Sequence, residues 1–126
     1  MEKGIFKDNG VHMEAHEFDT VKLLLHKDHD IELIPTSQIK GMRTPDILMD
    51  GILWEIKSPT GNGKNTIKHT IQNASHRSVN IIVDLRRIKM EQEQAITELI
   101  EHFNLSKRLK RMLIIKKDKE ILDLIK

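Results

Sequence analysis

The segment TPDILMDGILWEIK, which spans Thr44–Lys57, decides the fold that this sequence predicts. Its centre, Asp50-Gly51, lies between two apolar runs. Such a dipeptide favours a two-residue hairpin turn, because glycine adopts positive φ without a Cβ penalty. A turn at these residues places Asp46 opposite Glu55, and directly opposed side chains lie roughly 5 Å apart at Cβ. We therefore expect two carboxylates close together at the open end of a hairpin.

The rest of this hairpin is apolar. The expected register forms three apolar cross-strand pairs: Ile47 with Trp54, Leu48 with Leu53, and Met49 with Ile52. These residues put apolar side chains on both faces, as in an interior pair of strands. A charge in such a position is costly unless it has a partner or a function.

Lys57 lies two residues beyond Glu55 and therefore on the same face of the strand. Together with Asp46 it completes a set of two carboxylates and one ammonium group, which suits a divalent cation and an activated water molecule. The alternative is a solvated Glu-x-Lys pair at a strand edge, which contributes little to stability. We favour the functional site, because the surrounding apolar residues predict a buried position.

The composition of the 126 residues bounds the possible classes of protein. The length suits a single domain that spans residues 1–126. Cysteine is absent, which excludes disulfides, thiolate zinc sites and cysteine nucleophiles. One Trp, three Phe and no Tyr leave little for base stacking, so a single-strand-binding sheet is not expected. We recognise neither a signal peptide nor an apolar run of membrane-spanning length.

The distribution of charge is more informative than its total. The net charge is only +2, although 32% of the residues are charged. Residues 14–32 are mostly acidic, whereas residues 64–89 and 107–119 are mostly basic. An acidic pole beside basic walls fits a metal site at the base of a phosphate-binding cleft.

Hydrophobic periodicity and turn residues predict an α/β (α+β) fold with a mixed central sheet flanked by helices. Residues 1–12 indicate a loose lead-in. The expected helices span residues 13–27, 65–77 and 91–103. The expected strands span residues 31–35, 45–49, 52–57, 80–85, 111–117 and 120–125, with loops at 36–44 and 58–64.

The first expected helix carries a candidate metal ligand. Its apolar residues follow helical spacing, and Glu17 shares their inward stripe. An acid there is a candidate third ligand beside Asp46 and Glu55. The helix dipole by itself also favours an acid in the first turn, so both interpretations stay open. The sequence also leaves open whether Glu14 completes the site in place of Glu17.

Asp46 and Glu55 offer the hard oxygen ligands that Mg²⁺ or Mn²⁺ takes, with water and substrate phosphate in the remaining positions. Zn²⁺ fits less well, because His12 and His16 lack a third ligand at suitable spacing, and we interpret them as surface residues. A bound ion would activate water and offset charge on a phosphoryl group. Lys57 could position that water or stabilise the pentacovalent phosphorus. The expected reaction is phosphodiester hydrolysis without a covalent intermediate.

Asp46 followed by Glu55-Ile56-Lys57, with the helical acid Glu17 before them, resembles the PD-(D/E)xK nuclease superfamily, and Pro45 supplies the proline of that motif. A longer string is more specific: PDILMDGILWEIKSPT at residues 45–60, NTI at 65–67, Ala-Ser at 74–75 and IIVDLR at 81–86. This string resembles the C-terminal tRNase toxin domain of contact-dependent growth-inhibition (CdiA-type) and related polymorphic toxins. The resemblance covers roughly residues 14–117.

The resemblance implies a restriction-endonuclease-like fold and a metal-dependent nuclease that cleaves tRNA. The domain would be the C-terminal module of a larger secreted or surface-displayed protein. It would act in the cytoplasm of the target bacterium and be neutralised by a cognate immunity protein. Carried over by position, Glu17, Asp46 and Glu55 would hold the metal, and Asp46, Glu55 and Lys57 would be the catalytic residues. His76 departs from the pattern, since Gln or Lys is expected there.

The helix after the site carries candidate contacts to RNA phosphates. These residues are Lys64, Lys68, His69, Gln72, His76 and Arg77. A solvated helix face is the alternative for each of them. The basic cluster at residues 107–111 is open to the same interpretations, or to contact with an immunity protein.

Two other functions are compatible with the sequence. A DNA endonuclease of the same superfamily is one, since the site chemistry does not use the 2′-hydroxyl. A catalytically inactive nucleic-acid-binding module is the other, and the intact set of two acids and a lysine disfavours it.

Overall fold

The computed structural model describes residues 4–35 and 44–126. Most of the expected loop at 36–44 therefore lies outside the described residues. Helices and strands follow one another in the order β1 (Phe6–Lys7), α1 (Ala15–His26), β2 (Ile31–Leu33), β3 (Ile47–Met49), β4 (Ile52–Lys57), α2 (Thr66–Ser75), β5 (Asn80–Asp84), α3 (Gln92–Leu105), β6 (Arg111–Ile115) and β7 (Ile121–Ile125). None of these helices is long and apolar enough to cross a membrane.

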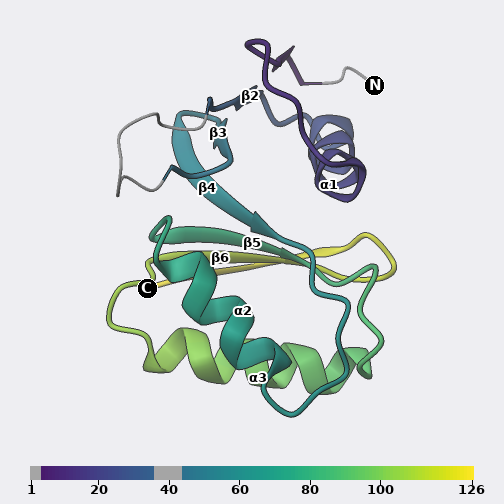
Figure 1. The fold of residues 1–126 in the computed structure, drawn as a ribbon, viewed down its shortest axis with the longest axis vertical. Helices are drawn as coiled ribbons and strands as arrows, with labels where there is room; N and C mark the ends of the chain where they lie inside the picture. The colour runs from purple at the N-terminus through teal and green to yellow at the C-terminus, as the bar shows by residue number, and fades with distance from the viewer. Residues whose placement is uncertain (1–3, 36–43) are drawn as a thin grey trace.

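The strands of the described chain form one mixed sheet in the order β1-β2-β3-β4-β5-β6-β7. β1 and β2 are parallel, β2, β3 and β4 are antiparallel, β4, β5 and β6 are parallel, and β7 returns antiparallel to β6. α2 and α3 are the crossovers of the parallel part, and they pack together below it in Figure 1, whereas α1 lies beside the other part of the sheet. The predicted mixed sheet flanked by helices is confirmed.

Two hydrophobic cores lie on opposite faces of the central strands, because successive side chains of a strand alternate. On one face, Ile81 and Val83 of β5 belong to the core that includes α2 and α3. On the other face, Ile82 packs in a second core with Trp54 of β4 and Val21 of α1. Each helical layer therefore has its own apolar support.

The predicted hairpin turn and its register are confirmed. Asp50 and Gly51 have positive φ values of 51° and 83°, as a type I′ turn requires. The cross-strand pairs are Ile47 with Trp54, Leu48 with Leu53, and Met49 with Ile52. The ladder ends there, because the N–H of Asp46 donates to the carbonyl oxygen of Trp54 at 3.0 Å. Regular pairing would place Asp46 opposite Glu55, so the backbone of Asp46 is shifted by one residue from that register.

β4 changes partner at Glu55. Residues Ile52–Trp54 pair with β3, whereas Glu55–Lys57 pair with β5. Where β3 has ended, Oδ2 of Asp46 accepts a hydrogen bond from the N–H of Ile56 at 2.8 Å. This bond satisfies a backbone donor that has lost its strand partner. The backbone of β4 therefore fixes the Asp46 carboxylate.

Two details differ from the sequence-based expectation. Residues 1–12 are not a loose lead-in throughout, because β1 joins the sheet and the Phe6 ring packs on Phe18 with centroids 5.8 Å apart. The hairpin is also not buried on both faces, since Leu53 is 46% exposed. On that face α2 packs on α3 and on both β4 and β5 (Figure 1), and Leu53, near the start of β4, remains largely uncovered.

A buried polar contact ties α1 to the sheet. Asp84, the last residue of β5, is buried, and the hydroxyl of Thr20 on α1 donates to its Oδ2 at 2.6 Å. Nε and Nη2 of Arg86 donate to the same carboxylate at 3.0 and 2.8 Å. Burial by itself raises the pKa of Asp84, but the hydrogen bonds from Arg86 and Thr20 outweigh it, so this pKa lies below its ordinary value.

We predict that Thr20→Val destabilises the domain, because it removes a donor from a buried carboxylate while keeping the shape of the side chain. A hydrogen bond to a charged group contributes about 1.5–3 kcal/mol, and the free energy of unfolding in urea should fall by that amount. Thr97→Val is the matched control, since the Thr97 hydroxyl donates to the Glu93 carbonyl on the exposed side of α3. The control should lose less than about 0.5 kcal/mol. Equal losses of unfolding free energy in the two variants would show that the hydrogen bond from Thr20 to Asp84 does not hold α1 on the sheet.

Candidate active site

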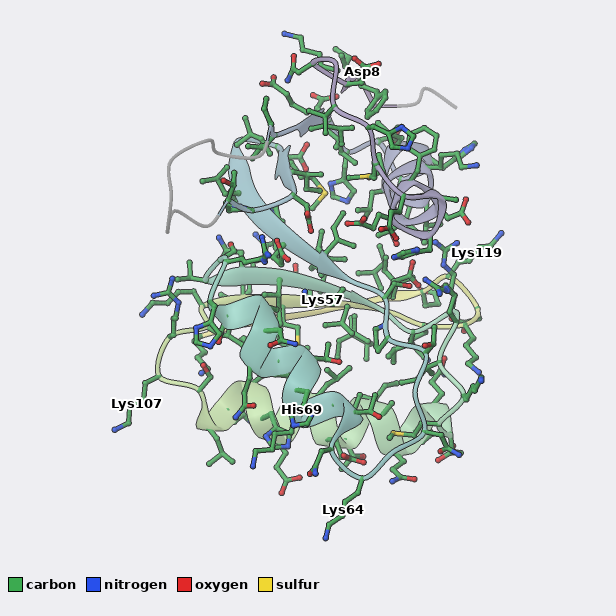
Figure 2. All side chains as sticks on the ribbon, viewed as in Figure 1. Asp8, Lys57, Lys64, His69, Lys107 and Lys119 are labelled. Carbon is green, nitrogen blue, oxygen red and sulfur yellow. The ribbon has the colours of Figure 1, made fainter. Side chains whose placement is uncertain are left out.

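A polar hollow of about 510 Å³ opens between the N-terminal end of α1, β4 and α2. Its lining combines four carboxylates with several hydrogen-bond donors: Glu14, His16, Glu17, Asp46, Glu55, Ile56, Lys57, Ser58, Pro59, His69, Thr70, Asn73 and Arg77. In Figure 2, Lys57 lies near the middle of the molecule and His69 lies below it on α2. Segments distant in the sequence thus meet around one acidic cavity.

Glu55 is the most buried acid of this hollow, with 3% of its surface exposed. Its Oε2 lies 3.5 Å from Nζ of Lys57 and 3.6 Å from Nε of Arg77. Its Oε1 is buried and receives no hydrogen bond from a donor of the described residues, although a protonated Glu55 can itself donate a hydrogen bond to the Asp46 carboxylate. Both cations therefore approach one oxygen and leave the other without a donor.

Burial raises the pKa of Glu55 to about 8, and the nearby Asp46 carboxylate contributes to the rise. Lys57 and Arg77 act in the opposite direction without cancelling it. At neutral pH and without a bound cation, Glu55 is therefore mostly protonated. At neutral pH, a full negative charge on Glu55 requires a further positive partner.

α1 brings Glu17 to the same hollow. Burial raises the pKa of Glu17, and repulsion from Asp46 raises it further. The Asp46 carboxylate is therefore close enough to Glu17 to repel its charge. Glu14 also lines the hollow. Both of the acids between which the sequence left the choice open therefore face this cavity. Ligand atoms of Glu14, His16 and Glu17 all lie within 4.8 Å of one another.

The arrangement fits a hard divalent cation. Carboxylate oxygens are the donors that Mg²⁺ and Mn²⁺ prefer. Oε1 of Glu55 receives no donor, so an ion could bind this buried oxygen in place of the proton that Glu55 otherwise shares with Asp46. Asp46 is already oriented by the N–H of Ile56, so one ligand would need no large rearrangement.

The sequence matches the family model of the contact-dependent growth inhibition CdiA C-terminal domain over residues 43–121. The chain belongs to this family. No curated protein matches the chain. Among solved structures, the fold is similar to that of a CdiA-CT/CdiI toxin and immunity complex from Burkholderia pseudomallei. The TM-score is 0.73 at 18% identity, over 98% of this chain and 100% of that chain, and at this identity the likeness concerns the fold alone.

In this CdiA C-terminal domain, the four residues expected from the sequence to form the metal and catalytic set all line the hollow: Glu17, Asp46, Glu55 and Lys57. Two of the six candidate RNA contacts, His69 and Arg77, line it as well. The other four lie outside it: Lys64, Lys68, Gln72 and His76. Figure 2 shows Lys64 projecting from the far end of the molecule, away from Lys57.

Sequence reasoning missed other residues that line the hollow, among them Thr70, Asn73 and His16. Asn73 lies four residues after His69, so both lie on one face of α2. Arg77 follows four residues later, just beyond the end of the helix. That spacing could have identified Asn73. Nothing in the sequence indicates that His16 points to the same cavity.

We predict that Glu55→Gln removes a pH dependence of stability from the metal-free CdiA C-terminal domain. The pKa of about 8 exceeds the ordinary 4.5, so between these values the folded state holds a proton that the unfolded state releases. The free energy of unfolding of the wild type, relative to the variant, should therefore fall as pH rises through this range. The limiting slope is about 1.4 kcal/mol per pH unit.

Urea unfolding in EDTA across this pH range measures the slope. The matched control is Glu101→Gln, on an exposed position of α3, and it should keep the wild-type slope. A Glu55→Gln protein with the wild-type slope would show that Glu55 does not carry the proton.

Proposed function

We propose that this CdiA C-terminal domain is a metal-dependent endonuclease that hydrolyses RNA, with tRNA as its substrate, and thereby inhibits bacterial growth as a toxin. One observation carries the proposal: Glu55 is buried, one of its oxygens receives no hydrogen-bond donor, and Nζ of Lys57 lies 3.5 Å from the other. Asp46 and Glu17 line the same hollow. The sequence order of these residues supports a PD-(D/E)xK assignment.

The acids Glu17, Asp46 and Glu55 would hold the ion, and their oxygen donors suit Mg²⁺ or Mn²⁺. When bound, such an ion would supply a Lewis acid that activates water and offsets charge on a phosphoryl group. The raised pKa values of Glu17 and Glu55 support this role, because burial and repulsion from Asp46 disfavour the charged forms of both acids when no cation is bound. A cation at this position would favour the ionised acids.

Lys57 would be the catalytic cation of the protein itself. Its Nζ is held near Oε2 of Glu55, and its side chain remains 28% exposed to the hollow and solvent. From there it can donate a hydrogen bond to the attacking water or to a phosphate oxygen, on which negative charge grows in the transition state. As the new P–O bond forms, the bond to the leaving oxygen breaks, and that oxygen takes up a proton. The products are a phosphomonoester and a free hydroxyl.

The residues of α2 and of the turn after it that line the hollow are consistent with a nucleic-acid substrate. His69, Thr70, Asn73 and Arg77 offer donors there, and side chains of these kinds commonly contact phosphate oxygens. The choice of RNA, and of tRNA in particular, follows from the resemblance to the tRNase toxin domains. The chemistry by itself would serve DNA as well.

Membership in the CdiA C-terminal domain family supports a role in contact-dependent growth inhibition. The similar Burkholderia structure is a complex of a toxin with its immunity protein. We extend the role in growth inhibition and the binding of an immunity protein to this chain. Its parent protein would be secreted or surface-displayed, the domain would act in the cytoplasm of the target bacterium, and a cognate immunity protein would bind it.

Purified domain incubated with tRNA or with duplex DNA tests the proposal. We expect cleavage of tRNA with Mg²⁺ or Mn²⁺ and none with EDTA. Asp46→Asn and Lys57→Met should each lower the rate by about 10²–10³-fold, as does loss of a group that stabilises transition-state charge. Lys89→Met, an exposed lysine outside the hollow, is the control and should cleave at the wild-type rate.

The same variants tested for growth arrest in bacteria connect the chemistry to the toxin role. Expression of the wild type should stop growth, and expression of Lys57→Met should not. Cleavage of DNA without cleavage of tRNA would make the domain a deoxyribonuclease instead. Undiminished tRNA cleavage by Lys57→Met would place the active site elsewhere.

Arg77 should bind a substrate phosphate, because its Nε lies 3.6 Å from Glu55 while its side chain is still 43% exposed and lines the hollow. We predict that Arg77→Ala raises the KM for tRNA about tenfold and lowers the salt dependence of binding by about one unit of slope, as loss of one phosphate contact does. Arg87→Ala, an exposed arginine outside the hollow, should change neither. An unchanged salt slope in Arg77→Ala would contradict the contact.

A further inference from the structure

A second cavity, of about 660 Å³, lies between α1, the segment after β5 and the turn between β6 and β7. It shares no lining residue with the acidic hollow. Its lining carries more permanent positive charges than acids: Lys22, Lys27, Arg86 and Lys119, against Asp19 and Asp28. We call it the basic cavity. Its balance of charge is opposite to that of the hollow, where four carboxylates face Lys57 and Arg77.

The basic cavity and the hollow lie at the same edge of the sheet. β4, β5 and β6 are parallel, so their carboxyl ends meet at one edge. Lys57 is the last residue of β4, Arg86 lies two residues beyond the end of β5, and Lys119 lies in the turn after β6. Ligands of open sheets commonly bind outside the carboxyl ends of parallel strands. An extended ligand such as a nucleic-acid strand could therefore contact both cavities.

Arg86 is oriented in advance for a further acceptor. Its Nε and Nη2 donate to the buried Asp84 carboxylate at 3.0 and 2.8 Å, which fixes the plane of the guanidinium. Its Nη1 makes no hydrogen bond within the described residues, and the side chain remains 23% exposed. A guanidinium held in this way offers its free N–H groups to an anion with little loss of side-chain entropy. Asp84 offsets much of its charge, so the lysines would supply the attraction.

Lys119 occupies a backbone position that disfavours lysine. Its φ is 73°, and its N–H closes the β6–β7 turn by donating to the carbonyl oxygen of Lys116 at 2.9 Å. Glycine is the usual residue at such a left-handed position, because it has no Cβ. The Lys119 ammonium makes no ion pair or hydrogen bond within the described residues. The turn itself therefore gives no reason for a lysine there.

Helix electrostatics accounts for only part of the basic cavity. The negative end of a helix dipole favours cations near the last turn, which is sufficient for Lys27, the C-cap residue of α1. Lys22 pairs with Asp19 at 3.3 Å, and an exposed pair of this kind contributes little. Neither effect concerns Arg86 and Lys119, which reach the cavity from the sheet. An anionic ligand would relieve the repulsion among these cations.

We propose that the basic cavity binds backbone phosphates of the RNA substrate at nucleotides outside the cleavage site. The inference rests on the proposed function for the identity of the substrate. Phosphate contacts fix the register and orientation of a nucleic acid without reading its bases, so this cavity would hold the strand across the hollow. It touches no reacting atom, and its contribution is to the binding of substrate rather than to the chemical step.

Binding of tRNA to the metal-free domain in EDTA, measured by fluorescence anisotropy at several salt concentrations, tests the inference without cleavage. The double variant Lys27→Gln/Lys119→Gln removes two lysines whose ammonium groups have no partner within the described residues. We expect its Kd to rise about tenfold and the salt dependence of binding to fall by about two units of slope. With Mg²⁺ or Mn²⁺ present, KM should rise in proportion while kcat stays unchanged. Circular dichroism verifies that each variant is folded.

Lys107→Gln/Lys110→Gln is the matched control, because both lysines are exposed and the change in net charge is the same. They precede β6 and thus lie at the amino end of the parallel strands. Figure 2 shows Lys107 and Lys119 projecting from opposite sides of the molecule. The control should keep the wild-type Kd and salt slope. An equal loss of affinity in both double variants would reduce the effect to net charge and overturn the site.

Lys119→Gly separates a role in binding from a role in the turn. Glycine tolerates the positive φ, so this variant should unfold at a higher urea concentration than the wild type while its Kd for tRNA rises about threefold. Lys119→Arg keeps the charge and should keep the wild-type affinity. A Lys119→Gly protein with wild-type affinity would overturn the assignment of Lys119.

Failure of this inference can be told apart from failure of the proposed function. Weaker tRNA binding and a lower salt slope in Lys27→Gln/Lys119→Gln support the basic cavity even if the wild type cleaves neither tRNA nor DNA, in which case the nuclease proposal fails alone. Wild-type affinity in that variant, in a domain that cleaves tRNA, overturns the basic cavity alone. A wild type that binds no tRNA overturns it whatever the cleavage assay gives.

Discussion

The transfer of β4 from one strand partner to another is the constraint on which the rest of the structure depends. Its first half pairs with β3 and its second half with β5, so a single strand joins the antiparallel and parallel parts of the sheet. Glu55 lies at the point of transfer. β3 has already ended there, and the side chain of Asp46 takes the place of a strand by accepting the N–H of Ile56. The hollow exists because the sheet is incomplete at this point.

Contacts both outside and inside the hollow hold its acids in place. The bond between Thr20 and Asp84 fixes α1 one turn beyond Glu17, and the hairpin turn fixes the end of β3. Lys57 and Arg77 approach the buried Glu55 from the same side. Like charges are thereby kept close together, although Asp46 raises the pKa of both Glu17 and Glu55. Stability alone would not favour such a concentration of acids, which is typical of functional sites.

Local rules explain what could be predicted from the sequence. The Asp50-Gly51 dipeptide determines its own turn, and the alternation of strand residues then places Lys57 beside Glu55. The approach of the helices follows from packing, which no local pattern encodes. The orientation of α2 depends on its contact with α3, so Asn73 lines the hollow whereas Lys68 does not. The position of His16 likewise depends on how α1 docks.

The two separate cores have a consequence for how the hollow forms during folding. α1 belongs to one core and α2 to the other, and the hollow takes residues from both helices and from β4 between them. Neither half can assemble the cavity alone. The parallel pairing of β4 with β5 also requires the chain to close a long crossover, which is a slow step in folding. An unfolded chain would therefore lack this hollow until nearly all of the chain has folded, and the nuclease activity that we propose would be among the last properties to appear.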